Sequence, residues 1–153
     1  MHTVQLLLKP SKYERYEIDR RFRALAHLHN VCVKYARKCM VRLQYDKDYA
    51  ALRQQYMELS KKLSKKEELS KEDKAEKKAL SAQLAERRSA YGLSKSALEC
   101  YLKVCGKQFS KLLSSQQVQT EADRVWCGVE KCLFGNGKAL RFKRFMDFDT
   151  IGG

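Results

Sequence analysis

The sequence predicts a mainly α-helical chain in which a helical bundle with hairpins is inserted between two short β-strands. Apolar residues recur every three or four positions through most of residues 12–134, which is the spacing of amphipathic helices. Residues 3–9 and 138–148 instead alternate apolar and polar side chains, as strands do. Two short strands do not make a stable sheet. The predicted β-structure is therefore incomplete and would need further strands.

A long first helix is predicted over residues 12–43. It follows Pro10, the only proline in the chain, which marks the passage from the first strand to the helix. The residues predicted to face the core are Ile18, Phe22, Leu25, Cys32, Ala36, Cys39 and Leu43.

A helical hairpin is predicted next, with its tip near residues 64–70. Its first arm follows Asp46 and carries aromatic and leucine residues at three- and four-residue steps. The tip lies in a stretch rich in Lys and Glu, which is typical of an exposed hairpin. Ser70 and Asp73 have the spacing of a capping motif and would start the second arm.

Two more helices are predicted after Gly92. The first would begin at Ser96, with Glu99 completing a capping box, and the second at Thr120. The polar residues 114–120 are interpreted as the connection between them. A Gly-Asn-Gly turn at residues 135–137 would then lead into the closing strand.

One face of the first helix is almost purely cationic. Arg21, Lys38 and Arg42 widen it, and no acidic residue interrupts it. Solvated helix faces usually mix charge signs at i,i+4, so this pattern favours contact with a polyanion, most plausibly a phosphate backbone. The alternative is a solvated face that happens to be basic. The residues of this face, called the basic ridge below, are Arg20, Arg23, His27, Asn30, Lys34 and Arg37.

The overall charge agrees with an extended polyanionic partner. The 153 residues carry 32 Lys plus Arg against 18 Asp plus Glu, a net charge of +14 that is spread along the chain. With 44% apolar residues the composition is that of a globular protein. Apolar runs are too short to cross a membrane, so we expect a cytoplasmic protein that does not bind membranes.

The sequence offers no convincing catalytic or metal site. Cys100 and Cys105, like Cys127 and Cys132, have four residues between them, whereas zinc sites usually place two. Asp147 has an acidic neighbour two residues on but no third carboxylate for a metal cluster. We therefore expect no catalytic residue, no metal and no cofactor in this chain.

Both ends of the chain resemble a known family. The opening Leu6-Leu7-Leu8-Lys9-Pro10-Ser11, the helix with Asn30 and Lys34-Tyr35-Ala36-Arg37, and the closing Gly135-Asn136-Gly137-Lys138-Ala139-Leu140-Arg141-Phe142-Lys143-Arg144-Phe145 are similar to the N-terminal part of TnpB-type proteins. These are RNA-guided nucleases of insertion sequences, ancestral to the type V CRISPR effectors. In that family a wedge-type β-barrel is interrupted after its first strand by a helical recognition lobe.

The resemblance implies both an architecture and a function. Residues 1–11 would be the first wedge strand, 12–134 the recognition lobe, and 135–153 the return to the barrel. The partners would be guide RNA and target DNA, together with the remainder of the nuclease or a second copy, and the chain would help to read the target-adjacent DNA motif. Cleavage would belong to a later RuvC-like domain, absent here, that needs Mg²⁺.

The binding residues follow from the basic ridge and the two predicted strands. Arg20, Arg23, Lys34 and Arg37 are expected on phosphates, and His27 and Asn30 on sugars or bases. The complete set of predicted nucleic-acid-binding residues is Lys9, Arg20, Arg23, His27, Asn30, Lys34, Arg37, Lys38, Arg141, Lys143 and Arg144.

Two other functions fit the sequence. The chain could be a stand-alone RNA-binding accessory or DNA-binding repressor with no nuclease attached. It could also be an interaction protein that uses the Lys/Glu hairpin as an antiparallel coiled coil, with its charge serving solubility alone.

Overall fold

The computed structural model describes residues 9–64, 70–135 and 137–148, and this part of the chain is helical. The elements are α1 Lys12–Gln44, α2 Lys47–Leu63, α3 Lys71–Ala90, α4 Lys95–Gly106, the 3-10 helix η1 Lys107–Phe109, α5 Ser115–Phe134 and the 3-10 helix η2 Phe145–Asp147.

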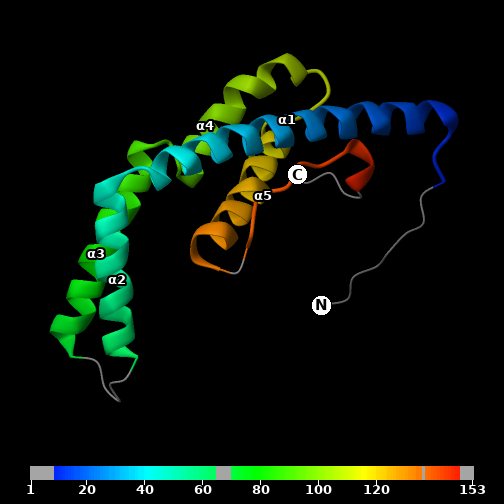
Figure 1. Ribbon diagram of the computed structural model, residues 1–153. Coiled ribbons are helices and arrows are strands. Elements are labelled where there is room, and N and C mark those ends of the chain that lie inside the picture. The colour runs from blue at the N-terminus through cyan, green and yellow to red at the C-terminus, as the bar shows by residue number, and fades with distance from the viewer. Residues whose placement is uncertain (1–8, 65–69, 136, 149–153) are drawn as a thin grey trace.

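Helix α1 is the axis on which the other elements are arranged (Figure 1). Helices α4 and α5 pack against each other and against α1, while α2 and α3 form a hairpin that projects from the C-terminal end of α1. Residues 137–148, called the closing segment below, return from α5 and lie along α1.

The predicted first helix is confirmed. Ser11 caps it through a capping box in which its Oγ accepts from the backbone N–H of Glu14 at 3.3 Å. Leu28, Cys32 and Ala36 are completely buried against α4 and α5. The small side chains at positions 32 and 36 let the helices approach closely.

The hairpin is joined to the end of α1 by a buried carboxylate. Asp46 caps α2 by accepting from the backbone N–H groups of Asp48 and Tyr49, at 2.9 and 3.1 Å. It also accepts from Arg87 of α3, at 2.7 Å from Nε. Helix α3 begins with the predicted capping box of Ser70 and its partner three residues on. The predicted tip falls largely on residues 65–69, outside the described residues.

Two predicted helix starts are wrong. Helix α4 is capped by Ser94, whose Oγ accepts from the Ala97 N–H at 3.2 Å, rather than by Ser96. Helix α5 begins with a capping box of Ser114 and Gln117, so the predicted connection over 114–120 is helical. Several serines and threonines in these stretches have capping spacing, and burial of the apolar face decides which of them is used.

The predicted closing strand and the wedge-type barrel are also wrong, because the described part of the chain contains no strand or sheet. The closing segment is irregular and ends in η2, and the first predicted strand falls mostly on residues 1–8, outside the described residues. A strand would place Leu140, Phe142 and Met146 on one face, yet Leu140 is buried while Phe142 is 51% and Met146 69% exposed. The alternation of apolar and polar residues in this segment therefore does not correspond to an alternation of buried and exposed side chains.

Within the described residues, none of the helices combines the length and apolar character required to traverse a bilayer.

Candidate nucleic-acid interface

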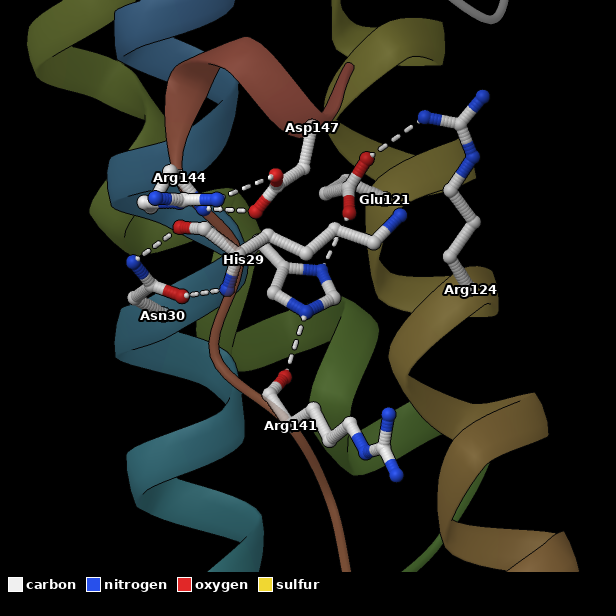
Figure 2. Close-up of polar contacts among 8 residues, drawn as sticks. His29, Asn30, Glu121, Arg124, Arg141, Arg144 and Asp147 are labelled. Carbon is white, nitrogen blue, oxygen red and sulfur yellow. Dashed lines mark hydrogen bonds and ion pairs between the residues drawn. The ribbon is translucent and has the colours of Figure 1, made fainter.

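A buried polar junction joins α1, α5 and the closing segment (Figure 2). His29 Nδ1 lies 2.6 Å from Glu121 Oε1, and both side chains are almost completely buried. The other ring nitrogen, Nε2, lies 3.2 Å from the backbone carbonyl oxygen of Arg141. Three segments distant in sequence therefore meet at a single imidazole.

The polar groups of this junction are paired with one another. Both nitrogens of His29 lie against oxygen atoms that can accept a hydrogen bond, one from the Glu121 side chain and one from the Arg141 backbone. Glu121 also accepts a charge-assisted hydrogen bond from Arg124 Nη1 at 3.0 Å. Both oxygens of this buried carboxylate therefore have a nitrogen partner, which compensates for their loss of water.

Two residues of the basic ridge hold the closing segment by its backbone. The Asn30 amide donates to the Lys143 carbonyl and accepts from the Lys143 N–H, both at 2.8 Å. Arg37 Nη2 donates to the Leu140 carbonyl. Side chains of α1 thus satisfy the backbone groups that a neighbouring strand would satisfy in a sheet. This explains how the segment satisfies part of its backbone without being a strand.

The ridge and the closing segment enclose an open groove of about 380 Å³. Among the residues that line it are Arg23 and His27 from α1 and Lys143 and Arg144 from the closing segment, with Asn30 at its wall. Cations from two parts of the chain therefore surround one concave surface. An anion in this groove would meet positive charge on both sides.

Three arginines on this side of α1 lie against aromatic rings. The guanidinium carbon of Arg23 is 4.2 Å from the ring centroid of Phe145, and that of Arg37 is 4.5 Å from the ring of Phe142. Arg20 lies 5.9 Å from the ring of Tyr16 and also forms an ion pair with Glu17 at 3.0 Å. These contacts restrict the arginines while their charges remain near solvent.

The predicted site residues separate into two groups. Arg23, His27, Asn30, Lys143 and Arg144 come together at the groove. The others are exposed elsewhere along α1 or the closing segment, except that Lys9 precedes α1. Arg37 also donates a hydrogen bond to the backbone of the closing segment. This second group consists of Lys9, Arg20, Lys34, Arg37, Lys38 and Arg141.

Sequence reasoning missed His29 and Glu121. A signal was present, since Glu121 lies among the buried residues Ala122 and Val125 of α5, and His29 follows Leu28 on the buried side of α1. A lone acid and a lone histidine on two core-facing surfaces indicate a buried pair. The apolar spacing of the first helix would also place Tyr16 in the core, but its side chain is 61% exposed.

The remaining ionisable side chains do not assemble a metal site. Across the described residues, no group of three His, Cys, Asp or Glu side chains could hold a metal ion. Cys32 is completely buried, and burial raises the pKa of its thiol to about 12. A thiol in this environment behaves as a small apolar side chain rather than as a nucleophile.

No known protein family, curated protein or solved structure matches this chain.

Proposed function

We propose that this chain is a non-catalytic nucleic-acid-binding module whose contact surface consists of the basic ridge and the closing segment. The observation that supports the proposal is the groove between them, where Arg23 of α1 meets Lys143 and Arg144. The hydrogen bonds between Asn30 and Lys143 connect positions 113 residues apart. Folding thus brings the positive charges of Lys143 and Arg144 beside the basic ridge.

The electrostatics favour a polymer over a small anion. Lys34 and Lys38 continue the exposed positive surface along α1 beyond the groove, and the whole chain carries a net charge of +14. Binding of a phosphate backbone to such a surface releases condensed counterions, which provides affinity that falls steeply with salt.

The finer proposal is the one implied by the resemblance to TnpB-type proteins. The chain would be the nucleic-acid-gripping N-terminal part of an RNA-guided DNA endonuclease, in contact with guide RNA and the guide–target heteroduplex and helping to read the target-adjacent motif. The Mg²⁺-dependent cleavage would be performed by a RuvC-like domain in another part of such a protein. The wedge barrel is not part of this proposal, which depends on the helical lobe and its charge.

The test is a salt titration of RNA affinity. The variant Arg20→Ala/Lys34→Ala/Lys38→Ala removes three exposed cations of α1 and spares Asn30 and Arg37, which hold the closing segment. Each lost phosphate contact lowers the slope of log K against log salt by about 0.7–0.9, so the slope should fall by about two to three units.

The matched control removes the same charge elsewhere. Lys61→Ala/Lys62→Ala/Lys71→Ala deletes three exposed cations from the hairpin and should change the slope by less than one unit. Equal effects of the two variants would refute a defined surface on α1. Absence of RNA affinity at physiological salt, together with a defined dimer in light scattering, would instead favour the interaction protein.

A further inference from the structure

Phe142 is an exposed aromatic ring that the protein holds in place. The ring is 51% exposed, and the guanidinium carbon of Arg37 lies 4.5 Å from its centroid. Arg37 is itself fixed by its hydrogen bond to the Leu140 carbonyl. Phe142 therefore has one restricted neighbour and retains a large solvent-facing surface, at the cost of leaving an apolar ring in water.

Tyr16 is a second ring of this kind near the other end of the ridge. It is 61% exposed, and Arg20 lies 5.9 Å from its centroid. Positions 16, 20, 23, 27 and 34 follow three-, four- and seven-residue steps, so the tyrosine lies on the same face of α1 as the ridge. From position 16 to position 37 the helix rises about 32 Å. The two rings flank the cations along this length.

Exposed aromatic rings beside cations suit unpaired nucleic acid better than a duplex. In a duplex the bases are stacked on each other and present phosphates outward, so the rings would remain in water. Unpaired bases offer their π-faces, and stacking on an aromatic side chain is worth about 1–3 kcal/mol per base. An acidic protein would complement the positive charge of the ridge, but it would gain no contact comparable to base stacking from aromatic rings that lie among arginines.

We propose that Phe142 and Tyr16 stack on unpaired nucleobases, so that the surface binds single-stranded nucleic acid in preference to duplex. This inference depends on the proposed function, because the ridge and the groove supply the phosphate contacts. Of the partners proposed above, it favours unpaired guide RNA over the heteroduplex. The rings add base contacts that carry no charge. Affinity then has two separable parts, one sensitive to salt and one insensitive to it.

The experiment measures fluorescence anisotropy of the full chain with an unstructured RNA of about 15 nucleotides and with the duplex of the same sequence. The single strand should bind more tightly. Phe142→Ala should weaken single-strand binding about 5- to 150-fold, the loss of one stacked base, and leave the salt slope unchanged. Phe142→Trp should retain the affinity, and Tyr16→Leu should weaken it in the same salt-independent way.

A matched control is available on α5. Phe134 is 62% exposed and lies under Arg88 at 4.8 Å, but it is not part of the ridge or the closing segment. Phe134→Ala should leave RNA affinity unchanged. Circular dichroism verifies folding, and Phe142→Leu, which keeps apolar volume but removes the π-face, replaces the alanine variant if that variant unfolds.

Three results would overturn the inference. If duplex binds as tightly as single strand, or if Phe142→Ala and Tyr16→Leu bind as tightly as the unaltered chain, the rings are not stacking platforms, although the proposed function stands. If neither RNA binds the unaltered chain at any salt concentration, the proposed function and the inference both fail.

Discussion

Removal of the Glu121 carboxylate should strongly destabilise the fold. The side chain is completely buried and lies 2.6 Å from His29, so Glu121→Ala leaves a buried imidazole with an uncompensated donor and a cavity beside it. Breaking a buried pair by removing one partner costs about 3–5 kcal/mol. In a chain of this size each kcal/mol lowers the melting temperature by about 2–4 °C. The expected decrease is therefore roughly 6–20 °C.

Urea denaturation and limited trypsin digestion would measure the two effects of this change. The free energy of unfolding should fall by the amount given above. Cleavage in the closing segment, which contains Arg141, should accelerate because His29, whose Nε2 lies 3.2 Å from the Arg141 carbonyl oxygen, loses the carboxylate that positions its ring. Glu130→Ala is the matched control, since this acid is on the same helix but exposed, and it should stay within about 0.5 kcal/mol.

A double variant distinguishes the contribution of the contact between His29 and Glu121 to stability from that of side-chain packing. His29→Leu/Glu121→Leu replaces the pair by apolar side chains, and such replacements are often neutral or stabilising. It should therefore recover most of the stability lost in Glu121→Ala. A loss below about 1 kcal/mol in Glu121→Ala, or a double variant less stable than the single one, would refute the assignment of the pair as a compensated buried junction.

Three further predictions concern the carboxylate that caps α2, the turn at Gly92 and the cysteine thiols. The hydrogen bonds from Arg87 hold the pKa of Asp46 well below its ordinary value of 3.8, so this carboxylate stabilises the folded state above that value and ceases to do so as the pH falls through the folded pKa. The urea midpoint of the unaltered chain should therefore exceed that of Asp46→Asn, with the full difference at pH 7 and a smaller one below about pH 4. A difference that does not depend on pH would contradict the assignment. Gly92 has φ +74° and its missing Cβ would collide with the Tyr35 hydroxyl, so Gly92→Ala should lose at least about 1–2 kcal/mol in the same assay, and a neutral result would show that the turn relaxes. Iodoacetamide at pH 8 should modify the exposed Cys100 rapidly and leave Cys32 unmodified until urea unfolds the chain, because burial raises the pKa of Cys32 to about 12. Mass spectrometry would detect both outcomes. Rapid modification of Cys32 in the native state would contradict its burial.

The sequence was sufficient to predict the helices whose apolar pattern is long and whose cap is local. Helix α1 has 33 residues with a buried stripe from Ala24 to Leu43, and its capping serine at position 11 pairs with Glu14 only three residues on. Short polar stretches were less informative. Ser96, Ser114 and Thr120 each have an acid or amide three residues on, yet the caps in the structure are Ser94, which has Ala97 at that position, and Ser114.

The closing segment could not be predicted, because its structure depends on distant side chains. Its backbone groups are satisfied by Asn30 and Arg37, more than 100 positions earlier. Local alternation of apolar residues resembled a strand, and nothing nearby indicated that an amide and a guanidinium would replace a neighbouring strand. The same two side chains were interpreted as ligands for nucleic acid, since a cationic helix face does not reveal which of its members bind intramolecularly.

The attachment of the closing segment through carbonyl and amide groups has a consequence for how this surface can change. Every amino acid except proline supplies both groups, so the segment can exchange Arg141, Phe142 or Arg144 for other residues and still be held by α1. Substitutions at these exposed positions would change the side chains presented to solvent while the attachment to α1 stays in place. At these positions, surface chemistry and attachment thus depend on different atoms, whereas the buried side chains of Leu140 and Phe148 anchor the segment in the core.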